Sequence, residues 1–546
     1  MELYKQWRNP TQQTQQLQAE INEAIAALPP EGDRLQQVHQ AMNKFDTVNT
    51  PEQPQPVFRF DVTPFQLFQE HTERLFALRD TSLRSCFQAW VHVNRRGQAR
   101  QQMRITAKLA RKQRLQRIFD IAGRAEQAHD HFTLYQAIHE LAPKKWYRRF
   151  QLRDHQGHLL NPDQAADQLQ DWFQKLYNDD SAPLRSTPFQ WPFTEQEMLA
   201  GFQSMPLLKA VAPEYAPAPY WQCAAHNVAE YLTPYLMQCG EQGVFPACWS
   251  QGTLFFIPKV AKRSLLPKEL RPITLLEPCS KICMGLLAQC IHDEAGLLLQ
   301  SLPQFAYMRG RGGDDALNRL VTHCRKVRTL CEEHQYPVHH QAQSTTPRAV
   351  SGGVLLSLDL SKAFDNVNRA TLITSLRRLG ISNNLISFLQ TIYCQTFYQF
   401  EYKGHSRSFR TTRGIRQGCK AAPGLWLTFT ALLMDEIARG TAPSWMLDCL
   451  TLFADDICMH EEVETPEQLH RLMKNMGTVL DLLEQLQMDV NIAKTSAIFR
   501  LKGPWMWPTP DSWQERARRA QCIACGADAR MAPTRPQAPV PWMRLD

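Results

Sequence analysis

The sequence predicts an α+β fold in which a mostly helical N-terminal region precedes a larger block of strands alternating with helices. From residue 57 to about 180, apolar residues recur at i, i+3 and i+4, as in LFQEHTERLFALRD at 67–80, a pattern that indicates amphipathic helices. From about 190 to 502, short apolar or β-branched runs alternate with helical patterns. With 546 residues, 43% of them apolar, the chain has material for about three domains.

Composition divides the chain into four segments. Residues 1–56 are Gln-rich and end in PEQPQP, which predicts a helix followed by a flexible linker. Residues 57–190 are expected to form a helical, basic connector, and 191–502 the strand-containing block. The segment 503–546 is rich in Pro, Arg and Trp and is expected to be irregular.

The net charge of +8 is concentrated in two places. Residues 95–117 contain nine Arg or Lys and no acid, and KKWYRRF at 144–150 adds four more around two aromatic rings. Basic runs mixed with rings favour nucleic acid as a partner, although a solvated helix face explains a single run equally well. The candidate nucleic-acid-binding residues are Arg104, Lys108, Arg111, Lys112, Arg114, Lys144, Lys145, Arg148 and Arg149.

The fifteen cysteines are scattered, and no secretory signal precedes them. We therefore expect a reducing, intracellular setting rather than a disulfide framework. The longest apolar stretch, GLWLTFTALLM at 424–434, is too short to span a bilayer and predicts a buried helix. No membrane partner is expected.

The chemistry is expected near residues 354–380. VLLSLDL predicts a buried strand that ends near Asp359, and SKAFDNVNRATLITSLRRL predicts one helix that stops at Gly380. The stretch 413–440 predicts a polar loop that runs into an apolar helix.

Two adjacent acids interrupt the apolar run LTLFADDICM at 450–459, which predicts a β-hairpin with Asp455 and Asp456 at its tip. If the strand ending at Asp359 lies beside this hairpin, three carboxylates converge, and such a cluster requires cations. Oxygen ligands without nearby His or Cys favour Mg²⁺. Taken singly, Asp359 is also explained as a residue at a helix N-terminus, and the Asp pair as ordinary turn residues.

Six motifs in one order resemble the reverse transcriptases of long interspersed (non-LTR) retrotransposons, over roughly residues 195–500. They are the fingers motifs IPK (257–259) followed by LRPITLLEPCSKI (270–282), then QFAYMRGRGGDDAL (304–317), LDLSKAFDNV (358–367), RQG (416–418), FADD (453–456) and DVNIAKTSAIF (489–499). The resemblance implies the fingers and palm of a right-hand polymerase with an antiparallel palm sheet. The reverse transcriptases of group II introns are related.

The resemblance also implies roles for individual residues. Asp359 and Asp455 would bridge two Mg²⁺ ions (Mn²⁺ is an alternative), with Asp456 as the third acid and Leu360 lending a carbonyl. Phe364 takes the steric-gate position, where a ring collides with a ribose 2′-OH, although a core phenylalanine is the plainer explanation. The remaining roles are triphosphate binding by Lys259 and Arg271, a nucleotide pocket at Gln417 and Gly418, and proton donation to pyrophosphate by Lys494, which could instead be a surface lysine.

The sequence departs from the family in several places. CKAAPGLW follows RQG where Cys-Pro-Leu-Ser-Pro is usual, and APEYAPAP (212–219) replaces a Pro-Gly-x-Asp turn. Residues 332–352 are expected to be a flexible insertion, and CIAC (522–525) resembles half of a zinc knuckle. Residues 1–190 contain no acid/His constellation typical of an endonuclease, and only about 45 residues follow the last motif, so the chain is expected to be a fragment without nuclease and with little of a thumb.

The function expected from the resemblance is RNA-directed DNA synthesis from dNTPs on an RNA template with a DNA primer. The RNA of its own element is an expected partner, and the nucleus an expected location. Two alternatives remain: a catalytically silent remnant that only binds nucleic acid, and a group II intron-type enzyme, which the short C-terminal tail argues against.

Overall fold

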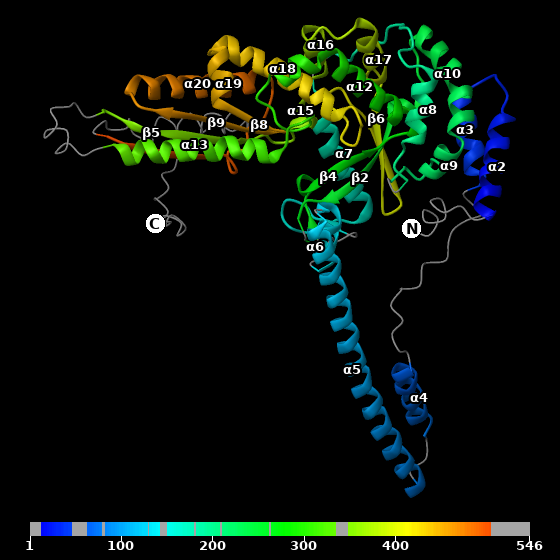
Figure 1. Ribbon diagram of the computed structural model, residues 1–546. Coiled ribbons are helices and arrows are strands. Elements are labelled where there is room, and N and C mark those ends of the chain that lie inside the picture. The colour runs from blue at the N-terminus through cyan, green and yellow to red at the C-terminus, as the bar shows by residue number, and fades with distance from the viewer. Residues whose placement is uncertain are drawn as a thin grey trace. The chain divides into compact units, whose positions relative to one another are not determined.

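The computed structural model describes residues 12–45, 63–78, 82–128, 130–141, 150–179, 182–207, 210–260, 262, 264–334 and 348–503 (Figure 1). Contacts group the chain into two compact units. The first comprises Met1–Thr14, Phe45–Leu159 and Ile257–Arg271, and the second Gln15–Lys44, Leu160–Phe256 and Pro272–Asp546. The segment boundaries expected from composition, at residues 56, 190 and 502, stay predictions.

The first unit is dominated by one long helix. Its elements are α4 (Thr63–Ala77), α5 (Leu83–Gln127), α6 (His131–Leu141), β1 (Gln151–Leu152), β3 (Ser264–Leu265) and the 3₁₀ helix η2 (Pro267–Glu269). Ser82 caps α5 by accepting the Ser85 N–H at 3.3 Å, and α4 and α6 both pack against α5. The 45 residues of α5 extend roughly 67 Å at 1.5 Å per residue.

The second unit contains most of the helices, one whole sheet and most of a second. Its helices are α2 (Gln12–Ala26, within the unit from Gln15), α3 (Arg34–Asn43), α7 (Pro162–Tyr177), α8 (Glu195–Gln203), α9 (Ala218–Cys223), α10 (Ala225–Gln242), α11 (Ala247–Ser250), α12 (Pro278–Gln300), α13 (Gly313–Glu333), α15 (Ala363–Asn366), α16 (Arg369–Arg378), α17 (Asn383–Tyr393), α18 (Ala422–Gly440), α19 (Pro443–Cys449) and α20 (Pro466–Gln485). Helix α3 packs against α10, where the Arg34 guanidinium donates to the Tyr231 carbonyl at 3.0 Å.

One sheet carries the expected acids. It has the order β10-β5-β9-β8, and every pairing in it is antiparallel. Its strands are β5 (Ser351–Asp359), β8 (Leu450–Phe453), β9 (Asp456–Val463) and β10 (Ser496–Lys502). Helix α13 covers one face and α20 the other (Figure 1). A Cβ added at Gly353 of β5 would lie 2.3 Å from Val327 of α13, which shows how closely that helix packs on the sheet.

A second sheet has the order β4-β2-β6-β7. Its strands are β2 (Gln251–Pro258), β4 (Leu270–Leu275), β6 (Phe397–Tyr402) and β7 (His405–Arg410). Strand β2 pairs with β6 in parallel over residues 251–253, and β6 pairs with β7 as an antiparallel hairpin. Helix α7 packs against β6 and β7. Together the two sheets and their helices confirm the mixed α+β class.

The expected helix after Asp359 is wrong in one respect, because it is two helices. α15 ends at Asn366, Val367 is extended, and α16 begins at Arg369. Asn368 interrupts the helix because its side chain caps α16, accepting the Thr371 N–H at 3.0 Å. The expected stop is confirmed, since α16 ends at Arg378 and Gly380 follows with φ +76°.

The apolar run at 424–434 lies inside α18 and is buried, as expected. Within the described residues, α12 is the one helix long and apolar enough to cross a membrane by length and composition, a test that core helices also pass. Buried residues of α12 include Ile282, Leu287 and Ile291, and the helix packs against α8 and α18. The expected insertion at 332–352 lies largely outside the described residues, as does CIAC.

Candidate active site

The pairing of β5 with β9 places two of the three expected acids opposite each other. Asp359 and Asp456 are cross-strand partners, and Phe453 pairs with Asp456 to close the hairpin around Ala454 and Asp455. Partners in an antiparallel pair share a face, and their Cα atoms lie about 4.5–5.5 Å apart. The third acid, Asp455, is the next residue in the turn. Residues nearly a hundred positions apart thus meet at one end of the sheet.

This end of the sheet is electrostatically unfavourable for anions. Partial burial and then the charges of Asp455 and Asp359 raise the pKa of Asp456, while the ammonium of Lys494 opposes that rise. Asp455 also contributes to raising the pKa of Tyr307, after burial of the phenol. A cation at the acids would relieve this repulsion.

The segment that follows α20 supplies two partners to Asp359. The Asp359 carboxylate accepts a hydrogen bond from the Asn491 side-chain amide at 3.0 Å and forms an ion pair with the Lys494 ammonium at 3.1 Å. The Asn491 N–H donates to the Asp359 carbonyl at 2.8 Å, and Leu360 forms an antiparallel bridge with Val490. Lys494 therefore lies directly against Asp359. Asn491 was missed by sequence reasoning, although it is the first residue of the Asn-x-x-Lys-Thr box.

Phe364 lies on the short helix α15 and is half-buried. Its ring stacks on Trp426 of α18, with centroids 4.9 Å apart and planes 25° apart. Tyr307 meets the Phe364 ring edge-on, with centroids 6.4 Å apart. Partial exposure distinguishes Phe364 from the buried core, and the three rings form an aromatic cluster.

Gln417 is held by a buried carboxylate. Its side-chain amide donates to Asp365 Oδ1 at 2.7 Å, and the Tyr177 hydroxyl donates to the same oxygen at 3.0 Å. Asp365 is only 3% exposed and lies on α15 directly after Phe364. Sequence reasoning also missed Asp365, which lies within the quoted motif LDLSKAFDNV.

Position 418 requires glycine, because of its backbone conformation and because of the atoms that surround it. Its φ is +105°, and a Cβ there would lie 2.5 Å from the Thr274 carbonyl oxygen. The preceding carbonyl, of Gln417, accepts the Thr274 N–H at 2.8 Å. The loop thus runs directly against β4.

Arg416 of the same motif is buried and serves the fold. Its guanidinium donates to the carbonyls of Trp249 at 2.9 Å and of Ile392 at 3.3 Å. A second buried guanidinium, Arg369, donates to Thr396 Oγ1 at 2.8 Å, and burial lowers its pKa to about 10. Both guanidinium groups lie over the ring of Tyr393.

The expected triphosphate ligands belong to the first unit. The Lys259 ammonium donates to the Lys268 carbonyl at 3.1 Å, and Arg271 is exposed on β4. The expected nucleic-acid ligands Arg104, Lys108, Arg111, Lys112 and Arg114 are exposed on α5, where Arg114 forms an ion pair with Glu140 of α6 at 3.3 Å. Lys144, Lys145, Arg148 and Arg149 lie outside the described residues.

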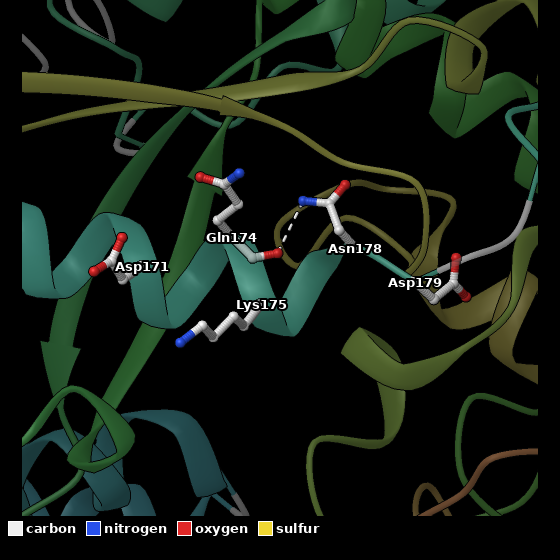
Figure 2. Close-up of a pocket in the computed structure, with 5 residues that line it drawn as sticks. All are labelled: Asp171, Gln174, Lys175, Asn178 and Asp179. Carbon is white, nitrogen blue, oxygen red and sulfur yellow. Dashed lines mark hydrogen bonds between the residues drawn. The ribbon is translucent and has the colours of Figure 1, made fainter.

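An open depression follows the C-terminal half of α7 (Figure 2). Asp171, Gln174, Lys175, Asn178 and Asp179 line it. The Asn178 amide donates to the Gln174 carbonyl at 2.8 Å and to the Arg410 carbonyl at 2.8 Å. None of the expected site residues lines this depression, and the Asp179 carboxylate accepts hydrogen bonds from Thr412 Oγ1 at 3.1 Å and from the Asn368 side-chain amide at 3.4 Å.

The donor chemistry of the acids fits a hard divalent cation, because it consists of carboxylate oxygens. In the described part of the chain, no three His, Cys, Asp or Glu side chains converge as a ready cation cage. The carboxylate of Asp359 is instead turned to Asn491 and Lys494. A cation at this site would therefore compete with the Lys494 ammonium for Asp359.

Comparisons with known proteins show what the chain is similar to. Residues 257–520 match the family described as "Reverse transcriptase (RNA-dependent DNA polymerase)". The "Retrovirus-related Pol polyprotein from type-1 retrotransposable element R1" of Bradysia coprophila is 25% identical over 231 residues, which are 42% of this chain and 20% of that protein. The chain thus spans about a fifth of the length of this relative.

Solved structures give a weaker likeness. The apo telomerase of Candida tropicalis covers 56% of this chain and 61% of its own, with 11% identity and a TM-score of 0.34. A telomerase of Candida albicans in complex with a fragment of telomeric RNA covers 52% of this chain and 48% of its own, with 11% identity and a TM-score of 0.33. Likeness at these scores places no residue of the site.

An antiparallel hairpin presents the paired acids opposite a third acid, as the resemblance to a polymerase palm leads us to expect. Through residues 257–520, just under half of its length, the chain is similar to the reverse transcriptase family. The expected resemblance to the reverse transcriptases of non-LTR retrotransposons is confirmed.

Proposed function

We propose that this chain is an RNA-directed DNA polymerase that extends a primer 3′-OH with deoxynucleotides on an RNA template. The observation that carries the proposal is the register that sets Asp359 opposite Asp456, beside Asp455, within residues that match the reverse transcriptase family. That register supports it because it brings acids from distant segments to one end of the sheet, and nucleotidyl transfer uses cations held by carboxylates.

The three acids would hold the cations, with the Leu360 carbonyl beside them. Two Mg²⁺ ions are the proposed occupants, and Mn²⁺ is an alternative with the same preference for oxygen ligands. When bound, such ions activate the attacking oxygen and stabilise the leaving one. Asn491 would keep the Asp359 carboxylate oriented through its 3.0 Å hydrogen bond.

Lys494 is the proposed proton donor to the departing pyrophosphate. Its ammonium lies 3.1 Å from Asp359, which supports this role because the proton is held at the acids rather than on a distant surface. The Lys494 side chain is 66% exposed, so solvent can replenish the proton after each turnover.

Phe364, Gln417 and Gly418 are the proposed lining of the nucleotide pocket. The half-buried Phe364 ring suits a steric gate against the 2′-OH. Gly418 has φ +105°, which favours glycine, and the missing Cβ would let the loop backbone approach a nucleotide closely. Lys259 and Arg271 are proposed as triphosphate ligands on the sequence resemblance alone.

Helix α5 is the proposed contact to template RNA or to the template–primer duplex. Its exposed Arg and Lys supply a phosphate-binding surface, and the exposed Ile105 and Leu109 interrupt that surface with apolar contacts.

The test is primer extension by the purified chain on poly(rA)·oligo(dT) with dTTP and Mg²⁺. We expect product from the native chain and none from Asp455→Asn. The matched control is Asp481→Asn, which removes one exposed carboxylate of α20 and should leave the rate unchanged. Product that persists in Asp455→Asn would come from a contaminating polymerase. No product from the native chain, with RNA binding retained, would favour a catalytically silent remnant.

A further inference from the structure

The tip of the acidic hairpin has an uncommon backbone. Ala454, the residue before the Asp pair, has φ +56°, and Asp455 does not share this positive φ. A positive φ at only the first central residue is typical of type II′ turns, where glycine is usual. For alanine this conformation costs on the order of 1 kcal/mol, and it persists only where the surroundings impose it.

Gln304 imposes it from one side. This side chain is fully buried, and its carbonyl oxygen accepts the Ala454 N–H at 3.1 Å while its amide donates to the Ala454 carbonyl at 3.1 Å. The same oxygen accepts the N–H groups of Phe305 at 3.1 Å and Ala306 at 3.0 Å. The flanking backbone is bonded to Leu452 of β8, so the amide has little freedom to turn.

Trp426 holds the tip from the other side. Its indole N–H donates to the Ala454 carbonyl at 2.9 Å, which gives that oxygen two donors from two different elements. The same indole stacks on Phe364, at 4.9 Å between centroids. One buried side chain of α18 therefore contacts both the turn that presents the acids and the ring of the proposed gate.

We propose that Gln304 and Trp426 are positioning residues that hold the Ala454 peptide and so aim the Asp455 and Asp456 carboxylates, and that Trp426 also sets the position of Phe364. Cation binding and discrimination between dNTP and rNTP are then coupled through one indole. This inference rests on the proposed function. It assigns no chemistry to either residue, because neither touches a reacting atom.

Three variants separate the contributions. Gln304→Met removes all the side-chain hydrogen bonds at similar volume, Trp426→Phe removes the N–H but keeps a ring beneath Phe364, and Trp426→Leu removes both. The matched control is Phe429→Leu, because Phe429 is a buried α18 ring 5.5 Å from Trp426 without a hydrogen bond to the turn. Circular dichroism and thermal unfolding establish that each variant folds, and Trp426→Phe keeps the test open if Gln304→Met does not.

The first readout requires no turnover. Mn²⁺ binding is measured by the loss of the free-ion electron paramagnetic resonance signal. Asp455→Asn serves as the reference in which binding at the acids is lost. We expect Gln304→Met and Trp426→Phe to weaken Mn²⁺ binding roughly tenfold, the range found when partners of metal ligands are removed. Phe429→Leu should bind as the native chain does. If Gln304→Met and Trp426→Phe both bind Mn²⁺ as tightly as the native chain, the proposal is overturned.

The second readout is primer extension. In Gln304→Met and Trp426→Phe, kcat should fall roughly tenfold or more while KM for dTTP changes little, because misplacement of reacting groups raises the energy of the transition state. Trp426→Leu should in addition raise the ratio of rNTP to dNTP incorporation, which Trp426→Phe should not. Unchanged discrimination in Trp426→Leu would overturn the coupling to the gate. If the native chain incorporates no nucleotide, the proposed function fails. The Mn²⁺ measurement still decides whether Gln304 and Trp426 position the acids.

Discussion

At the scale of single residues, the acids are held together against their own repulsion. The sheet register, not any attraction between them, sets Asp359 opposite Asp456. Burial first, and then the charges of Asp455 and Asp359, raise the pKa of Asp456, so repulsion adds to the desolvation of its carboxylate. A site arranged to bind cations is thus expected to reduce the stability of the cation-free protein.

Replacing Asp456 by Asn should therefore stabilise the chain at neutral pH. Because the folded-state pKa lies above the ordinary 3.8, the charged form is disfavoured by folding, so stability is lost as pH rises above 3.8. The variant should have a higher Tm than the native chain at pH 7 without divalent cations, and the gain should shrink at pH 4. Asp481→Asn should give no such pH-dependent gain. Equal Tm values for Asp456→Asn and native chain at both pH values would contradict the prediction.

The Phe364 ring gives a second prediction at this scale. Phe364→Ala should raise the efficiency of rNTP incorporation relative to dNTP, because the ring that would meet a 2′-OH is removed while its support, Trp426, remains. Steady-state kcat/KM for the two nucleotides on one template measures the ratio. An unchanged ratio would mean that Phe364 only packs against its neighbours and does not act as a gate.

At the scale of elements, the packing of α13 on the acid-bearing sheet depends on neutral histidine. His323 of α13 and His460 of β9 lie with ring centroids 5.0 Å apart, and His323 pairs with Glu462 at 3.1 Å. The Lys326 ammonium lies 3.9 Å from Glu462, and Thr451 bonds to His460 at 2.9 Å. Burial first, and His323 second, lower the pKa of His460 to about 4.

This interface should make the fold acid-sensitive. A folded-state pKa of about 4 against 6.5 means that stability is complete above pH 6.5 and is lost as pH falls towards 4. His460 alone should remove on the order of 2 kcal/mol between pH 7 and pH 5. Urea unfolding at both pH values should show this loss in the native chain and in the control His470→Gln, which changes an exposed α20 histidine. In His460→Gln most of the loss should be absent, and an unaltered loss would refute the assignment.

At the scale of the whole molecule, the basic helix and the acids belong to different contact units. α5 has exposed Arg and Lys along much of its length, whereas the acids depend on a sheet that is formed entirely within the second unit. Binding of nucleic acid by α5 and catalysis at the acids should therefore be separable by mutation.

Charge reversal at Arg111, Lys112 and Arg114 should weaken RNA binding and reduce the salt dependence. For single-stranded RNA, loss of three phosphate contacts lowers the slope of log K against log salt by roughly two. Fluorescence anisotropy over a salt series measures both quantities, and extension at saturating template should remain near the native rate. The control reverses three exposed residues of the second unit, Arg377, Arg471 and Lys474. If both triple variants change the slope equally, α5 makes no specific contribution.

Much of this organisation could be predicted because it is local in sequence. The strand ending at Asp359, the hairpin that presents Asp455 and the buried helix α18 each follow from apolar periodicity and turn chemistry within about twenty residues. The order of the six motifs was enough to identify the family. The single helix expected after Asp359 failed because a cap at Asn368 outweighed the helical period.

Contacts between distant segments could not be read in this way. Gln304 reaches Ala454, Asn491 orients Asp359, and Asp365 holds Gln417 only because separate elements pack side by side. Burial of Arg416 was equally unpredictable, since an arginine in a polar loop is ordinarily exposed. Short-range patterns decided which residues are candidates for the chemistry. Long-range packing decided which other residues hold them in place, because a hydrogen-bond partner is set by the position of the backbone in space and not by its distance along the chain.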